Sequence, residues 1–109
     1  MKSYLLWIIT SAFLAEQPTV DIGKEIYKEK CKVCHGERGN VNPFAASVLD
    51  PPPRNFTLEK SKQELSKNRM IQSVTEGRPG TAMMPWKDVL TQIEIQSVVN
   101  FIRENFMPN

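Results

Sequence analysis

Two cysteines and a histidine lie within five consecutive residues of this 109-residue chain, in the stretch Cys31-Lys-Val-Cys34-His35. The chain has no other cysteine or histidine. Two thiols on one helical turn can each add to a vinyl group of a haem, and the histidine that follows is then placed to ligate the iron. The spacing therefore predicts covalent attachment of one haem c through two thioethers, with His35 as the proximal ligand.

Other uses of two neighbouring thiols fit the sequence less well. A disulfide between Cys31 and Cys34 is the structural alternative for an exported protein, but it would close a very short loop and add little stability. A structural zinc ion needs four ligands, and the cluster offers three. A thiol–disulfide active site is expected after a strand, and no strand run precedes Cys31. Haem attachment remains the prediction for the motif.

The second axial ligand of such an iron must come from another part of the chain. Two histidines of one chain are excluded, because His35 is the only one. Methionine is the usual partner in electron-transfer cytochromes c. We expect Met70 to pack in a helix core and Met107 to fray with the terminus. Met83 and Met84 lie side by side in a loop, far enough along the chain to reach the opposite face of the haem, and both stay open as the ligand.

The first helix is expected to carry the motif. It begins at Thr19 or Asp21, either of which can cap it, and its apolar stripe is formed by Ile22, Ile26 and Tyr27. This helix leads directly into the first cysteine. It therefore gives the cysteine-containing turn a rigid base.

Two later helices are each preceded by a capping-box pattern. Ser61-Lys-Gln-Glu64 predicts a helix that runs to Glu76, and Thr91-Gln-Ile-Glu94 begins a last helix with a broad apolar face. Residues 36–57, between the motif and the first of these two helices, are rich in Gly, Asn and Pro. We therefore expect a loop there that wraps a rigid group. No strand run is apparent, and the fold class is all-α.

Four stretches of the chain resemble class I cytochromes c and together span nearly all of residues 16–109. They read GKEIYKEKCKVCHG, DPPPRNF, GRPGTAMMPW and LTQIEIQSVVNFIR. The resemblance implies a cytochrome c fold of three to four helices, with the N- and C-terminal helices crossed, wrapped around one covalently bound haem. A first-helix glycine in that family permits close contact with an aromatic residue of the last helix. Gly23 and Phe101 are the matching residues.

The resemblance also implies roles for residues around the haem. The carbonyl group of Pro43 is the candidate acceptor for the second ring nitrogen of His35, a bond that orients the imidazole. Arg54 and Trp86 match residues that lie near the haem propionates in the family. A solvated loop charge is the alternative for Arg54, and ordinary packing at the haem edge is the alternative for Trp86.

The doubled methionine departs from the loop that is common in the family. Alignment from Gly80 forward or from Trp86 back places the ligand at Met83, whereas a proline directly after the ligand would select Met84. We predict Met83, because two alignment anchors agree on it. The predicted cofactor-binding set is then Cys31, Cys34, His35 and Met83, and the metal ligands are His35 and Met83.

Residues 1–15 have the features of a secretory signal. A positive start precedes an apolar run from Tyr4 to Ala15 that is too short to span a bilayer. Cleavage after Ala15 leaves residues 16–109 as one cytochrome c domain with a net charge close to zero. Phe13 departs from the usual small residue before such a site, so a retained anchor, and with it membrane contact, stays open. We expect a periplasmic protein that does not bind nucleic acid.

These features favour a single-electron carrier that shuttles electrons between redox proteins by transient docking, as in a respiratory chain, and that is not an enzyme. With His35 and Met83 on the two axial positions of the iron, no position is left for a small-molecule substrate. Two other functions stay open. One is a haem-based ligand-binding or sensing domain in which a small molecule displaces the methionine, and the other is a dedicated cytochrome subunit of one oxidoreductase complex.

Overall fold

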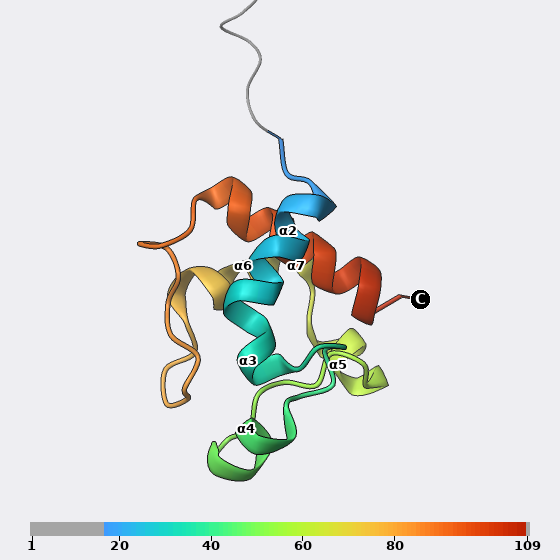
Figure 1. The fold of residues 1–109 in the computed structure, drawn as a ribbon, viewed down its shortest axis with the longest axis vertical. Helices are drawn as coiled ribbons and strands as arrows, with labels where there is room; N and C mark the ends of the chain where they lie inside the picture. The colour runs from blue at the N-terminus through green and yellow to red at the C-terminus, as the bar shows by residue number, and fades with distance from the viewer. Residues whose placement is uncertain (1–16, 109) are drawn as a thin grey trace, which may run out of the picture.

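The described part of the chain, residues 17–108 of a computed structural model, is helical and contains no strand. Figure 1 shows its elements, which in chain order are α2 (Val20–Ile26), the π-helical turn η1 (Tyr27–Cys31), α3 (Lys32–His35), α4 (Pro43–Val48), α5 (Glu59–Glu64), α6 (Lys67–Glu76) and α7 (Gln92–Phe106). The all-α prediction is confirmed. Because α2, η1 and α3 run on without a break, they form one segment, and α4 and α5 are short helices beyond the three to four expected.

The predicted signal segment, residues 1–15, lies outside the described residues. Its cleavage therefore stays a prediction. Between residues 17 and 108, no helix combines the length and the apolar character that a bilayer-crossing segment needs.

The first and last helices cross at Gly23 (Figure 1). A Cβ atom built on Gly23 would collide with the backbone carbonyl of Ser97 and would lie 2.9 Å from Cβ of Phe101. Real Cβ atoms do not approach other heavy atoms this closely, so only glycine permits the two backbones to meet here. The expected contact between Gly23 and the aromatic residue of the last helix is confirmed.

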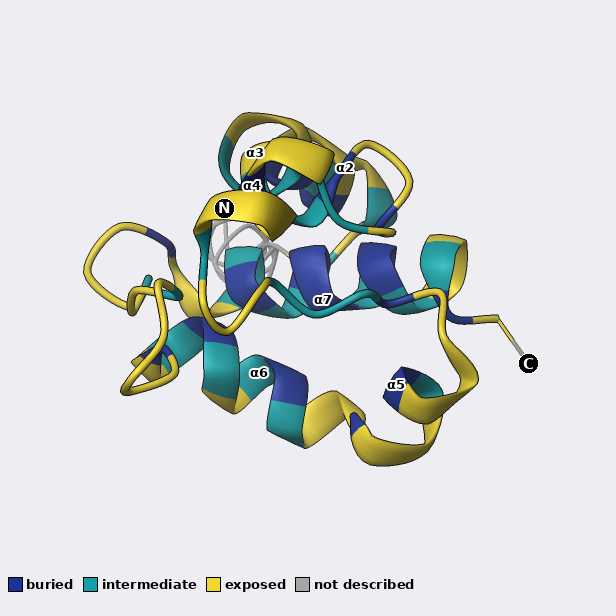
Figure 2. Cartoon of the chain, turned by 90° about the horizontal axis from the view of Figure 1, so that it is seen from below, coloured by how far each residue is buried: buried dark blue, intermediate teal, exposed yellow. Residues whose placement is uncertain are grey.

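The hydrophobic core lies along α7, which packs between α2 and α6 (Figure 2). Val98 and Val99 at the middle of α7 are completely buried. Thirteen buried residues form one cluster: Ile26, Tyr27, Phe56, Leu65, Met70, Val74, Leu90, Ile95, Val98, Val99, Phe101, Ile102 and Met107. The short helix α4 contributes none of them.

One of the two capping-box predictions is confirmed and the other is wrong. At α7 the Thr91 hydroxyl accepts from the Glu94 amide and the Glu94 carboxylate accepts from the Thr91 amide, which is a complete capping box. Ser61, in contrast, lies inside α5, and the expected helix is interrupted at Leu65. A new helix, α6, begins after Ser66, whose hydroxyl accepts from the Arg69 amide.

The two methionines that were set aside as ligands are both buried. Met70 belongs to the core cluster, as expected for an inward position on α6. Met107 also belongs to that cluster, so the expectation that it frays with the terminus is wrong. Burial of its side chain against the core holds the chain in place just beyond α7.

Candidate haem-binding site

The continuous helix carries both cysteines to the end of the α2–α3 segment. Cys31 is the last residue of η1, and Cys34 lies in α3. No disulfide joins the two thiols. Burial, and secondarily the neighbouring Cys34, raise the pKa of the Cys31 thiol to about 12, so this thiol is protonated at neutral pH. Two unpaired thiols on one turn are what thioether formation requires.

The buried side chain of Tyr27 fixes the end of α3. Its hydroxyl donates to the backbone carbonyl of Gly36 across 2.6 Å. The ring packs against the rings of Phe101 and Phe106, with centroids 5.5 and 5.1 Å away. Burial raises the pKa of Tyr27 well above its usual range, so the phenol keeps the proton that it donates. The residue directly after His35 is thus tied to the core.

The imidazole of His35 is held by a strap, residues Arg54–Phe56, that follows the three prolines. Its Nδ1 atom lies 3.0 Å from the carbonyl oxygen of Arg54. Its ring stacks on Phe56, with centroids 4.6 Å apart and an interplanar angle of 20°. Because a carbonyl oxygen only accepts hydrogen bonds, Nδ1 carries the proton and Nε2 carries the free lone pair.

The expectation that Pro43 supplies this carbonyl is wrong. The amide groups of Val41 and Asn42 donate to the carbonyls of His35 and Cys34, at 2.8 and 3.0 Å, so the chain after the motif folds back onto α3. Pro43 then becomes the first residue of α4, which Asn42 caps. The carbonyl group that faces Nδ1 of His35 is instead that of Arg54, in the strap.

The surroundings of His35 suit an iron ligand. Burial lowers the pKa of the imidazole below its usual value, which favours the neutral form that binds metals. No hydrogen bond to Nε2 is present among the described residues, and this atom is not completely buried, so its lone pair is free to bind a metal ion. A neutral imidazole with a fixed tautomer and two free thiols is a donor set that fits a covalently attached haem.

A folded loop presents the two adjacent methionines. The Met83 amide donates to the Thr81 hydroxyl across 3.1 Å, and the Met83 carbonyl accepts from the Arg78 amide across 3.0 Å. The loop is fastened to α6 by the Trp86 amide, which donates to the Val74 carbonyl across 2.9 Å. The backbone of Met83 is therefore fixed by hydrogen bonds at both its amide and its carbonyl group.

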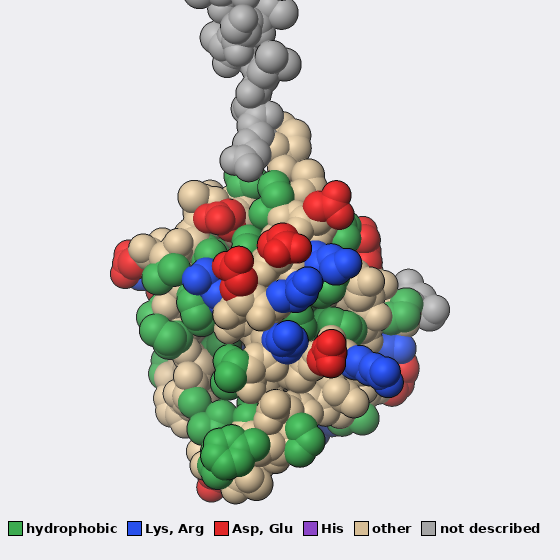
Figure 3. Space-filling model, in the orientation of Figure 1, with side chains coloured by type: hydrophobic (Ala, Val, Ile, Leu, Met, Phe, Trp, Pro, Cys, Tyr) green, Lys and Arg blue, Asp and Glu red, His purple; other side chains and the backbone are tan. Residues whose placement is uncertain are grey.

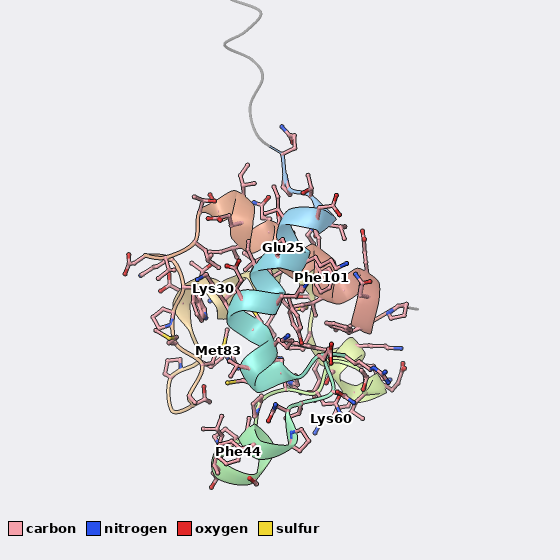
Figure 4. The ribbon with its side chains drawn as sticks, viewed as in Figure 1. Glu25, Lys30, Phe44, Lys60, Met83 and Phe101 are labelled. Atoms are coloured by element: carbon pink, nitrogen blue, oxygen red, sulfur yellow. The ribbon has the colours of Figure 1, made fainter. Side chains whose placement is uncertain are left out.

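The two methionine side chains differ in burial. Met84 is 55% exposed, whereas Met83 is partly buried and packs against the core cluster, as Cys31 also does. Figure 4 shows Met83 between this loop and α3. Of the two, Met83 lies on the motif's side of the loop and Met84 points to solvent.

Comparison with known proteins shows which family the chain belongs to. Residues 18–102 match the family model described as cytochrome C oxidase, cbb3-type, subunit III. The chain belongs to this family of c-type cytochromes. The resemblance to class I cytochromes c is confirmed by this match and by the solved structures that share the fold.

Three solved structures are similar to this cytochrome. The KustC0563 c-type cytochrome is 32% identical with a TM-score of 0.66, and the match covers 75% of this chain and 94% of that one. A mutant of Kustc0563 is 31% identical with a TM-score of 0.64, covering 74% and 94%. A chain of the Kuenenia stuttgartiensis reducing HAO-like protein complex Kustc0457/Kustc0458 is 29% identical with a TM-score of 0.66, covering 83% and 44%. No curated protein sequence matches significantly.

Arg54 and Trp86, which the resemblance placed near the propionates, each contact another part of this cytochrome, and their position relative to a haem stays a prediction. The Arg54 guanidinium forms an ion pair with Glu64 at 2.7 Å. Trp86 is partly buried against the core, and Nζ of Lys30 lies 5.8 Å from its ring centroid. The sequence did not identify Phe56 as the residue that stacks on the histidine. Phe56 could have been predicted to lie near the cofactor, because it comes three residues after the proline run that was expected to wrap the cofactor.

Proposed function

We propose that this c-type cytochrome is a single-electron carrier with one haem c, attached through Cys31 and Cys34. In this proposal His35 and Met83 are the axial ligands. The observation that carries the proposal is the fixed, neutral imidazole at the end of a helix that also presents two free thiols. Family membership supports the cofactor, because c-type cytochromes hold haem c covalently.

The haem, when bound, supplies a couple of ferrous and ferric iron that gains or loses one electron. The residues of this chain would hold that group in place. The Arg54 carbonyl and the Phe56 ring orient His35, and the hydrogen bonds of the loop hold Met83. Two filled axial positions favour electron transfer over catalysis at the iron.

Export is part of the proposal. Residues 1–15 would direct the chain to the periplasm, where haem c is attached, and the carrier would dock transiently on redox proteins. If the segment is retained, it would anchor the protein at the membrane. Weak, brief docking is what a shuttle between larger partners needs.

A dedicated subunit of one oxidoreductase complex is the second candidate function. It is favoured by the similarity to a chain of the reducing HAO-like protein complex. Purification of the tagged protein from its own cells separates the two functions. A shuttle elutes at the size of a monomer, whereas a dedicated subunit elutes with fixed partners in constant proportion.

The experiment that tests the carrier is expression with haem-maturation machinery, followed by spectroscopy and redox titration. We expect the sharp absorption bands of a reduced c-type haem, retention of haem on denaturing gels and a one-electron Nernst curve. The double variant Cys31→Ala/Cys34→Ala should lose the covalent haem. Rapid binding of carbon monoxide to the native ferrous protein at neutral pH would contradict a stable methionine ligand and favour the sensing function.

A further inference from the structure

The strap Arg54–Phe56 is fastened at three points. The Phe56 amide donates to the carbonyl of Gly39 across 2.8 Å, which ties one end of the strap to the loop after the motif. The other two points, at Arg54 and Asn55, both connect to α5. A short helix that the haem motif does not include thus holds the segment that bonds to His35.

Ser61 of α5 makes the first of these connections. Its hydroxyl donates to the backbone carbonyl of Asn55, and its side chain is almost completely buried, with 1% of the residue exposed. This role explains why Ser61 does not cap a helix, because its hydroxyl is used in a tertiary contact. Removing the hydroxyl would leave the Asn55 carbonyl without a partner in the protein.

Glu64 makes the second connection. One carboxylate oxygen lies 2.7 Å from Nη1 of Arg54, and the hydrogen bond lowers the pKa of Glu64, so the carboxylate is ionised at neutral pH. Both side chains are partly exposed, 34% for Arg54 and 40% for Glu64, so this ion pair adds little to global stability. Its effect is local, because it restricts the residue whose carbonyl faces Nδ1 of His35.

We propose that Ser61 and Glu64 are positioning residues for the proximal histidine, acting through the backbone of Arg54 and Asn55. This inference rests on the proposed function, in which His35 is an iron ligand. It adds that α5 sets how strongly the Arg54 carbonyl accepts the Nδ1 proton. A stronger bond at Nδ1 makes the imidazole a better electron donor, which favours ferric iron and lowers the reduction potential.

The first test compares Ser61→Ala with Ser97→Ala in the haem-loaded protein. Ser97 is a matched control, because it is also fully buried and its hydroxyl also donates to a backbone carbonyl, that of Ile93 on α7. Ser61→Ala loses one hydrogen bond, and Ser97→Ala loses two, because the Ser97 hydroxyl also accepts from the Thr19 amide across 3.1 Å; the control therefore perturbs the fold at least as much, but away from the strap. Only Ser61→Ala should speed hydrogen exchange at His35 Nδ1, by roughly fivefold to tenfold as expected for one lost hydrogen bond, and only it should raise the potential. Exchange is followed by NMR of the ferrous protein.

The second test compares Glu64→Gln with Glu59→Gln, and it decides the matter if Ser61→Ala does not fold. Both substitutions remove one negative charge from α5, but Glu59 pairs loosely with Lys62 at 3.9 Å and, among the described residues, forms no hydrogen bond or ion pair with the strap. The general electrostatic effect on the potential is therefore similar in the two variants. We expect faster Nδ1 exchange in Glu64→Gln alone, and a larger upward shift of potential than in Glu59→Gln.

Unchanged exchange and potential in Ser61→Ala and Glu64→Gln would overturn the inference. So would equal changes in the matched controls, or faster exchange with no shift in potential. Failure of the proposed function looks different. In that case the unsubstituted protein already lacks a covalent haem, or its spectrum shows that His35 is not a ligand.

Discussion

Met83 and Met84 have the same side chain, so what distinguishes them is the backbone that presents each one. The amide and carbonyl groups of Met83 both bond within the loop, whereas most of the Met84 side chain is exposed. Gly77 contributes to this arrangement, because a Cβ there would lie within 2.9 Å of the backbone atoms of Met83 to Pro85. The close contact holds the loop against the end of α6.

Replacing each methionine with alanine tests which sulfur binds the iron. We expect Met83→Ala to lose the weak iron–sulfur charge-transfer band of the ferric protein. Its reduction potential should fall by on the order of 0.1 V or more, within the ~0.8 V range that axial ligands set. Met84→Ala should keep the band and change the potential little, because its side chain is exposed. The opposite pattern would identify Met84 as the ligand.

Val41 has an unfavourable backbone conformation for a β-branched residue. Its φ is 76°, in the left-handed region that glycine adopts without strain. We expect Val41→Gly to raise the free energy of unfolding by about 0.5–1 kcal/mol, since the relieved strain exceeds the added entropy of the unfolded chain. Guanidinium titration of the ferric protein measures it. The control is Val89→Gly, in an exposed turn, which should lower the free energy of unfolding. If Val41→Gly lowers it by a similar amount, the backbone of Val41 is not strained.

At the scale of elements, the crossing of α2 and α7 depends on one missing side chain. Gly23→Ala would place a methyl group against the Ser97 carbonyl, which must shift. We expect the free energy of unfolding to fall by about 3 kcal/mol, which is at the upper end of the cost of overpacking. Gly80→Ala is the control, because nothing lies within 4 Å of its Cβ and only its φ of 81° opposes the change, at about 1 kcal/mol. Thermal unfolding compares the two variants, and a loss of stability in Gly23→Ala no larger than in Gly80→Ala would show that the contact with Ser97 can relax at little cost.

Sequence patterns predicted the start of a helix best where the contacts that cap it join residues close together in the chain. The α7 capping box involves only residues three apart, so Thr91 and Glu94 were readable from the sequence. Ser61-Lys-Gln-Glu64 is the same pattern, but its serine bonds to Asn55 and its glutamate pairs with Arg54. These contacts depend on where the strap lies in the fold, and the four residues of the pattern do not predict that position.

The site shows the same division between local and distant contacts. The motif from Cys31 to His35 lies on a helix as predicted, because its residues are consecutive. The acceptor for Nδ1 of His35 lies 19 residues further along the chain, and the wrong carbonyl, that of Pro43, was expected from the resemblance. The turn that makes Pro43 begin α4 follows from the backbone bonds of Val41 and Asn42, which depend on the fold.

At the scale of the whole molecule, the apolar core is unevenly distributed. The cluster extends along α2, α6 and α7, while α4 contacts only α3 among the described helices. Two of its side chains, Phe44 and Val48, are 74% and 58% exposed. Figure 3 shows hydrophobic side chains gathered at the end of the molecule where α4 lies, and mixed charges over α2. This distribution predicts that α4 opens independently of the rest of the fold.

Native-state hydrogen exchange of the haem-loaded protein tests this independence with two helix caps. Asn42 caps α4 by accepting from the Phe44 and Ala45 amides, at 2.9 and 3.2 Å, and Thr91 caps α7. Losing a cap costs about 1 kcal/mol, which is roughly a fivefold change in an opening equilibrium.

Asn42→Ala should therefore speed exchange about fivefold in α4 and leave the α7 amides unchanged. Thr91→Ala should instead speed exchange of the slowest amides in α2, α6 and α7 together, because those helices share the buried cluster. If Asn42→Ala also lowers protection in α7 by the same factor, α4 unfolds only with the whole domain. In that case α4 is part of the cooperative core, although it contributes no side chain to the cluster.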